Sequence, residues 1–259
     1  GCHETPNTIY TSIDGDADNF SDADIVDPIN IQTKDGFGII GAVEFADNLI
    51  VFGKKQAFVI DDTDDDTDIW GYVKAPWQGG AGNHKLIIKT PYDIVVMAPD
   101  GEIYSLRTAQ EFGDYKAASL LSASQMYRWI KEFVNLGRID QFHGVYDPVL
   151  RAVKIFVARN GYNTVDTALV FFIDRPQESA WMVHQNLSNT SGYSASSSTV
   201  IQGNDNDFKV YTGGYSGFAW ELETLARNDN SNGYYAGFRT PDLTFGSPRA
   251  YKQYGAGWI

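Results

Sequence analysis

Residues 49–60, LIVFGKKQAFVI, and residues 93–106, DIVVMAPDGEIYSL, decide the expected fold, because both have the pattern of two successive β-strands. In the second segment, Asp100-Gly101 separates two alternating apolar runs, residues 93–98 and 102–106. This is the composition of a two-residue hairpin turn, which needs positive φ angles. The recurrence of such a hairpin along the chain indicates a repeat architecture.

The composition favours one large all-β domain spanning residues 1–259. With 259 residues, 43% of them hydrophobic, the chain can bury a full-sized core without dividing into two domains. It contains 15 Tyr, 15 Phe and 25 Gly, and turn signals recur every few residues, which is typical of short strands joined by tight turns. No apolar run approaches the length of a membrane span, so we expect none.

The chain is acidic, with a formal net charge of −13 at pH 7. A surface that grips nucleic acid needs clustered Lys and Arg, so specific binding of DNA is not expected, although an acidic channel can still let DNA pass. The single cysteine, Cys2, excludes an internal disulfide. Because the chain opens with Gly1-Cys2-His3, without Met or an apolar leader, we expect a processed chain or a fragment.

Turn residues divide the chain into groups of short strands. The first group includes residues 8–14, 29–36, 38–45 and 48–53, and residues 54–61 close it; the second comprises 69–73, 84–90, 93–98 and 102–106. The third comprises 141–146, 151–158, 168–174 and 180–184, and the fourth comprises 199–202, 208–212 and 217–222. Further strands are expected at 233–239 and 242–245. The Asp-rich run DDTDDDTD at residues 61–68 repels itself and lacks apolar anchors, so it is expected to be a solvated loop between the first two groups.

One short helix is expected, at residues 124–133, as an insertion between strand groups. Apolar residues there follow the spacing of one helix face: Met126, Trp129, Ile130 and Phe133. Ser122 or Ser124 is suitably placed to cap its start.

Aromatic residues mark the same place in successive strand groups: Tyr10, Phe58, Tyr104, Phe171 and Trp220. Their separations are 48, 46, 67 and 49 residues, and the inserted helix accounts for the long one. From Trp220 round the two ends of the chain to Tyr10 is another 49 residues. Such a period predicts a five-bladed β-propeller whose N- and C-terminal strands, residues 8–14 and 233–245, share one blade. A large β-sandwich, or a pair of sandwiches, is the alternative architecture.

Asp14, Asp16 and Asp18 form a D-x-D-x-D run like the opening of an EF-hand calcium loop. The sixth position is Asn19 instead of Gly, and the twelfth is Ile25 instead of Glu. We therefore expect a solvated turn at this run and predict no metal site.

Other chemical motifs are missing from the sequence. Four histidines lack the spacing of a zinc site: His3, His84, His143 and His184. There is no GxSxG elbow, no P-loop and no GxGxxG after a strand. The glycine-rich residues 79–82 precede a strand instead of a helix, which is wrong for cradling phosphate. We therefore predict no cofactor.

Carboxylates near strand ends are the candidate acids, because five-bladed glycosidases place such groups on their innermost strands: Glu44, Glu102, Glu178, Glu221 and Glu223. Nothing in their spacing selects a catalytic pair, and in an acidic protein most glutamates are solvated charges. Four tryptophans are candidates for stacking on sugars, although most aromatics in a blade are core residues: Trp70, Trp77, Trp220 and Trp258. We predict that the chain is not an enzyme and has no catalytic residue.

The order of these patterns resembles the propeller domain of tailed-bacteriophage tail hub or nozzle proteins, the tail tubular family of short-tailed phages. The resemblance is carried by NTIYTSIDGDADNFSDAD (7–24), INIQTKDGFGIIGAVEFADNLIVFGKKQAFVI (29–60), APDGEIYSL (98–106), GVYDPVLRAVKIFVARNGYNTVDTALVFFIDRPQESAW (144–181) and GFRTPDLTFGSPRAYKQ (237–253). These are patterns of apolar and turn residues, without an invariant chemical group, and they cover residues 7–254.

The resemblance implies a structural virion protein located in the phage tail. Such a protein docks below the portal or adaptor ring and assembles with copies of itself, for which we expect a ring of six. It forms part of the channel through which DNA is ejected, and DNA passes without specific binding. The runner-up is a secreted carbohydrate-binding or glycoside-hydrolase propeller, and a generic intracellular scaffold is a third possibility.

Overall fold

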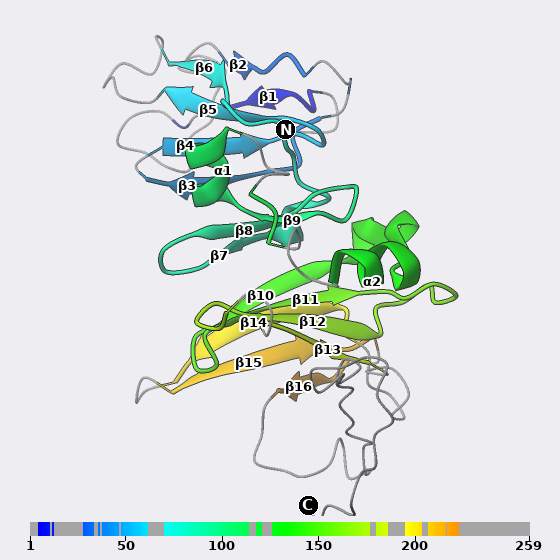
Figure 1. The fold of residues 1–259 in the computed structure, drawn as a ribbon. Helices are drawn as coiled ribbons and strands as arrows, with labels where there is room; N and C mark the ends of the chain where they lie inside the picture. Colours follow the sequence, from blue (N-terminus) through cyan, green and yellow to red (C-terminus); the bar gives the residue numbers. More distant parts are fainter. Residues whose placement is uncertain are drawn as a thin grey trace, which may run out of the picture. The chain divides into compact units, whose positions relative to one another are not determined.

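The computed structural model describes residues 5–10, 12, 28–33, 36, 38–46, 48–61, 70–113, 118–120, 126–176, 180–185, 195–203, 207–215 and 217–222. The chain divides into residues 1–224 and 225–259, and every described residue belongs to the first part. The single domain expected over residues 1–259 therefore remains a prediction. Strands dominate the described part and form antiparallel sheets (Figure 1), which confirms the all-β fold class.

The strands of the described part form five sheets, each with its strands in chain order. A two-stranded pair contains β1 (Thr8–Ile9) and β2 (Ile29–Asn30). Sheet one contains β3 (Gly41–Phe45), β4 (Asn48–Phe52), β5 (Ala57–Asp61) and β6 (Gly71–Lys74). Sheet two contains β7 (Ile87–Lys89), β8 (Ile94–Met97) and β9 (Ile103–Ser105). Sheet three contains β10 (His143–Asp147), β11 (Ala152–Val157), β12 (Thr167–Phe172) and β13 (Trp181–His184). Sheet four contains β14 (Ser197–Gln202), β15 (Phe208–Gly213) and β16 (Ala219–Glu221).

The first two groups divide at a different place from the one predicted. Strand β6 pairs with β5, from Phe58↔Lys74 to Asp61↔Gly71, and so belongs to sheet one. Residues 54–61 do not close the first group, and residues 69–73 do not begin the second. A charged run marks a chain connection, but its composition does not say whether the connection lies within a sheet or between two sheets. Residues 62–69 themselves lie outside the described part.

The turn of sheet two also differs from the prediction. Ala98 N donates to Glu102 O at 2.8 Å, so three residues, Pro99 to Gly101, lie between the paired ends. Gly101 alone has a positive φ, of 87°, and its N–H bonds to Ala98 O at 3.0 Å. The predicted two-residue turn at Asp100-Gly101 is therefore wrong. Proline at the first turn position and glycine in the left-handed region suit a type I turn followed by a bulge.

The described residues include two short α-helices, whereas the sequence predicted one. Helix α2 (Met126–Phe133) lies within the expected residues 124–133, and its Met126 and Ile130 are buried. Its Phe133 is 42% exposed, so the apolar face is narrower than expected. Helix α1 (Leu106–Phe112) was not predicted. It begins after Ser105, whose side chain accepts from Thr108 N.

In the described ranges, two 3₁₀ helices each lie just before the first strand of a sheet. They are η2 (His84–Leu86), at the start of the segment expected to be a strand at 84–90, and η3 (Leu136–Gln141). Asn83 caps η2 by accepting from Lys85 N. None of the described helices is long and apolar enough to cross a membrane.

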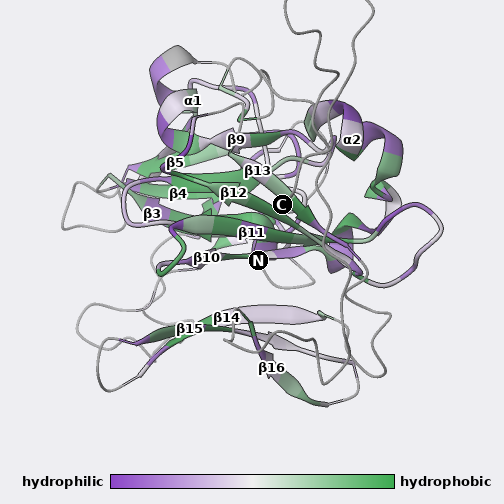
Figure 2. Cartoon of the chain, turned by 60° about the horizontal axis from the view of Figure 1, so that its bottom comes forward, coloured by the Kyte–Doolittle hydropathy of each residue, from purple (hydrophilic) through white to green (hydrophobic). Residues whose placement is uncertain are grey.

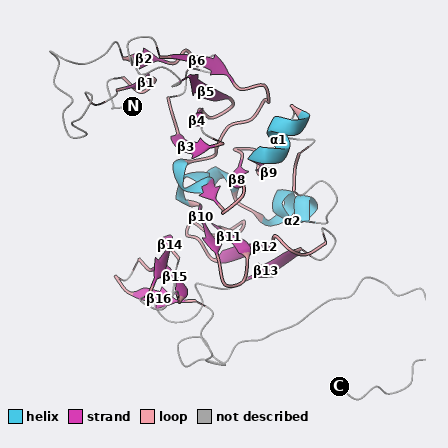
Figure 3. Ribbon diagram, turned by 90° about the vertical axis from the view of Figure 1, so that its left-hand side faces the viewer, coloured by secondary structure: helices cyan, strands magenta, loops and turns pink. Residues whose placement is uncertain are grey.

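Successive sheets contact one another through their first strands. Strand β3 contacts β7, β7 contacts β10, and β10 contacts β14. Figure 3 shows the strands of sheets three and four as two rows. Strand β10 stands at one end of the sheet three row, and β14 lies beside it. Apolar residues concentrate in the central strands, notably β4, β5, β11 and β12 (Figure 2). The core therefore lies between the sheets.

Sheets three and four contain the predicted strands. The registers His143↔Phe156, Ala152↔Phe172 and Val200↔Val210 join them as hairpins in chain order. The closing blade was predicted from residues 8–14 and 233–245, and residues 233–245 lie outside the described part. In the described part, Ile9 on β1 pairs with Ile29 on β2.

Candidate functional site

The first strands of the four larger sheets, β3, β7, β10 and β14, are the natural place to look for a functional surface, because they are where the sheets meet. We call this set the first-strand line. Its exposed side chains are small or polar, with one aliphatic exception: Ala42, Glu44, Lys89, Ser197, Thr199, Gln202 and Ile201. Lys89 Nζ lies 3.4 Å from Glu44 Oε2, so the acid and the base are paired with each other.

Two glycines allow the first strands to approach closely. A Cβ built on Gly41 would lie 2.9 Å from Ile87 Cδ1, and one built on Gly144 would lie 2.1 Å from Ile88 Cδ1. The isoleucines of β7 therefore fill the space that a side chain on β3 or β10 would occupy. Close packing, with no room for a larger residue, sets the spacing of these strands.

A depression of about 450 Å³ lies where the turns after β3 and β7 meet α1. Its lining includes two cations, two carboxylates and an exposed aromatic ring: Lys89, Arg107, Glu44, Asp93 and Tyr92. Asp93 has structural partners, because its Oδ1 accepts from Ile94 N at 2.7 Å and from Arg107 N at 3.0 Å. Its Oδ2 accepts from the Ser105 hydroxyl. The two cations and the two carboxylates give the lining no net charge.

His143, on β10, joins sheet three to sheet four. Its Nδ1 lies 2.8 Å from Ser198 Oγ on β14, and its Nε2 lies 3.1 Å from Ala195 O. The ring stacks on Phe156 at 4.7 Å between centroids, and the residue is 2% exposed. Burial lowers the pKa of His143 from 6.5 to about 4, and the positive charge of Lys85 adds to this lowering. The ring is therefore neutral at pH 7.

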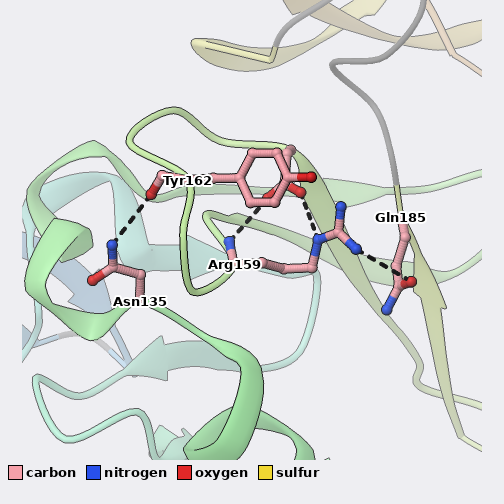
Figure 4. Close-up of polar contacts among 5 residues, drawn as sticks. Asn135, Arg159, Tyr162 and Gln185 are labelled. Atoms are coloured by element: carbon pink, nitrogen blue, oxygen red, sulfur yellow. Dashed lines mark hydrogen bonds and ion pairs between the residues drawn. The ribbon is translucent and has the colours of Figure 1, made fainter.

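A polar cluster ties the β11–β12 connection to the segment after α2 (Figure 4). Arg159 donates from Nε to Asp166 Oδ2 at 2.6 Å and from its backbone N to Oδ1 at 2.9 Å. Its Nη1 reaches Gln185 Oε1 at 3.4 Å, and its guanidinium lies over the Tyr162 ring. Asn135 Nδ2 donates to Tyr162 O at 3.2 Å. These bonds use the polar atoms to hold the connection in place, which indicates a structural role.

The glycine-rich residues 79–82 serve close packing between sheets one and two. A Cβ on Gly80 would lie 2.4 Å from Gly53 O and from the backbone of Lys54. Ala81 N donates to Gly53 O at 3.1 Å, and Gly82 N donates to Met97 O at 2.9 Å. The backbone N–H of Ala81 thus bonds to the residue that follows β4 of sheet one, and the next N–H, of Gly82, bonds to β8 of sheet two.

The described candidate acids lie on different elements and are not brought together as a pair. Glu44 is on β3, Glu102 is in the β8–β9 turn and accepts from Ser119 Oγ at 2.6 Å, and Glu221 is on β16. Glu221 bonds to Lys209 at 3.2 Å and to the Tyr211 hydroxyl at 3.1 Å. The other two candidates, Glu178 and Glu223, lie outside the described residues.

The tryptophans and histidines that the sequence offered as candidates also lie apart from one another. Trp77 is fully buried, which contradicts its place among possible sugar-stacking residues, and Trp70 packs against a core cluster. His84 is exposed on η2, and His184 is on β13 beside Met182. Within the described ranges, no three His, Cys, Asp or Glu side chains group as metal ligands. Candidates outside those ranges are Asp14, Asp16, Asp18, His3 and Trp258.

Sequence reasoning missed the role of His143 and a buried ion pair between Asp147 and Lys154. Lys154 lies in an otherwise apolar strand, AVKIFV, and that break in the pattern was a usable signal. His143 gave no such signal, because Ser198 is 55 residues away in the chain.

The chain matches no protein-family model, and no curated protein is significantly similar to it.

Proposed function

We propose that this chain is a five-bladed β-propeller that acts as a structural protein of a bacteriophage tail hub or nozzle. The observation that carries the architecture is the contact of β3, β7, β10 and β14 in chain order. In a propeller, each blade is an antiparallel meander, and blades surround a central axis. Sheets that succeed one another and touch through their first strands are what that arrangement requires.

The fifth blade would combine β1 and β2 with strands from residues 233–245. Support comes from the two-stranded pair, which is too small to be stable alone, and from Ile9, Ile29 and Ile31, which pack with sheet one. Removing residues 225–259 tests this closure. We expect the truncated chain to have a clearly lower melting temperature, and an unchanged one would contradict the closed ring.

The structural role is supported by the resemblance of residues 7–254 to the tail family and by the nature of the first-strand line. Its exposed side chains are small or polar apart from Ile201, and its exposed acid, Glu44, is paired with Lys89. The described candidate acids occupy separate elements. The acidic chain would repel the phosphate backbone, which suits a channel that DNA traverses without adhering. The proposed location is the tail of the virion, and the proposed partners are copies of the chain and the portal or adaptor ring.

The mass of the purified protein tests the assembly. Six copies of the 28.7 kDa chain would have a mass of about 172 kDa, and negative-stain images should show rings with a central opening. A monomer at every concentration would contradict self-assembly into a ring. A monomer that binds or cleaves oligosaccharides on a glycan array would instead favour the carbohydrate-active propeller.

A further inference from the structure

Sheet four is attached to sheet three through one of its two faces. Ser198, Val200 and Val210 share the face that packs toward sheet three. On the opposite face, Thr199 and Glu221 are exposed and Ile201 is 53% exposed. Separation of this sheet would therefore disrupt one interface, and the released strands, left without a packed face, would no longer protect their amides from exchange.

His143 lies in that interface and supplies two hydrogen bonds across it. A carbonyl oxygen can only accept, so Nε2 carries the proton that is donated to Ala195 O. Nδ1 is then the unprotonated nitrogen, which accepts from the Ser198 hydroxyl. A second proton must go to Nδ1, and the Ser198 hydroxyl would then have to turn its hydrogen away so that Oγ accepts from Nδ1. The resulting cation would have little water around it, because the ring is buried against Phe156.

The charges on the elements that pack against β10 do not offset such a cation. Those elements and β10 itself carry these charged or titratable groups: His84 and Lys85 on η2, Lys89 on β7, Tyr146 and Asp147 on β10, Lys154 on β11, and Lys209 and Tyr211 on β15. Strand β14 carries none. Asp147 is bonded to Lys154 at 2.9 Å, and Lys85 acts on the ring as a repelling charge.

We propose that His143 is an acid-sensitive latch, and that its protonation releases sheet four from β10 while sheets one to three stay folded. This inference rests on the interface alone and does not depend on the proposed function. Release is favoured because the freed ring regains water, and because sheet four has no second packed face among its described strands to hold it.

The direction of the pH effect follows from the lowered pKa of His143. A ring that titrates at about 4 when packed and at 6.5 when free favours the packed state fully above pH 6.5. This stabilisation is lost as the pH falls from 6.5 to about 4, and no more is lost below that. Between pH 7 and pH 5 the opening equilibrium of sheet four should rise roughly 20-fold.

Hydrogen exchange of the full chain, measured by mass spectrometry at pH 7 and pH 5 and corrected for intrinsic rates, tests the latch. Peptides from β14 and β15 should lose protection roughly 20-fold at pH 5, whereas peptides from β11 and β12 should keep it. In His143→Gln, whose side chain does not titrate, the difference between the two pH values should disappear. Equal loss in both sheets, or the same pH dependence in His143→Gln, would overturn the proposal.

Two further measurements apply if His143→Gln does not fold. NMR titration of the wild-type ring should place the pKa of His143 near 4, and a value at or above 6.5 would overturn the latch. In Lys85→Ala, at low salt, the pKa of His143 should rise and the loss of protection at pH 5 should shrink. If the pKa of His143 rises but the loss of amide protection at pH 5 is unchanged, protonation of the ring does not cause the release of sheet four.

Discussion

Lys154 Nζ lies 2.9 Å from Asp147 Oδ2, and the two side chains are only 2% and 3% exposed. Lys154 is central in β11, opposite Val145, and Asp147 ends β10. The other carboxylate oxygen of Asp147 accepts from Val149 N and Leu150 N, at 3.0 Å each. The ion pair thus fixes the turn at the end of β10 to the middle of the neighbouring strand.

Replacing Lys154 by Met should lower the free energy of unfolding by about 3–5 kcal/mol, because a buried carboxylate would lose its partner. Urea unfolding followed by fluorescence measures this change. Lys209→Met is the control, since Lys209 pairs with Glu221 on an exposed surface. A loss no larger in Lys154→Met than in this control would mean that Asp147 does not depend on the pair.

Gly80→Ala should destabilise the protein, because the new Cβ would meet the backbone of Gly53 and Lys54, which cannot move aside as a flexible side chain can. We expect a loss of about 2–3 kcal/mol in thermal or urea unfolding. Gly71→Ala is the matched change, since its Cβ would meet no atom within 4 Å. Equal stabilities for the two variants would rule out the close approach of residues 79–82 to sheet one.

The turn of sheet two should not tolerate β-branched residues. Replacing Asp100-Gly101 by Val-Val should lower the melting temperature, because Gly101 has a φ of 87°. An unaltered melting temperature would refute the turn geometry.

A pair of alanine substitutions separates backbone strain from side-chain packing at this turn. Gly101 and Gly161 have nearly equal φ angles, 87° and 88°, so alanine is strained equally at both. Only at Gly101 would the Cβ also press on Ile130 Cγ2, at 3.0 Å. Gly101→Ala should therefore cost more than Gly161→Ala in the free energy of unfolding, and the reverse order would contradict contact between the turn and α2.

Asp166→Asn tests the cluster around Arg159. Asp166 is fully buried, and the substitution removes the charge that Arg159 contacts at 2.6 Å, so we expect a loss of about 3 kcal/mol in the free energy of unfolding. Asp174→Asn makes the same change in an exposed pair with Arg151, where about 1 kcal/mol or less is expected. Similar losses in the two variants would show that burial does not strengthen the Arg159 contact.

Much of the fold followed from local patterns. Strands β10 to β16 were predicted because each alternates or is continuously apolar and ends at turn residues such as Asn160-Gly161. Helix α1 was missed because its seven residues are too few to show a helical period, although Ser105 and Gly113 were suitable caps. The partner of β6 was misassigned because strand pairing depends on contacts that a strand's own sequence does not encode.

The functional candidates were less predictable than the strands. Glu44, Glu102 and Glu221 look alike in the sequence, and only the structure separates an exposed ion pair from a bond to Ser119 or to Tyr211. His143 looked like any isolated histidine, since its importance arises from Phe156 and Ser198, on two other strands. Burial and long-range partners are global properties of the chain.

The backbone bonds of Ala81 and Gly82 also bear on how the molecule would respond to mechanical load. Shearing sheet one against sheet two would break the bond from Ala81 N to Gly53 O and the bond from Gly82 N to Met97 O together. The backbone of Gly80 also packs too tightly against Gly53 and Lys54 to shift. Between β10 and β14, the polar tie in the described part is the His143 ring, which bonds to Ser198 and Ala195. A pulling force should therefore deform the sheet three to sheet four junction first, with sheets one and two moving as a single stiff body.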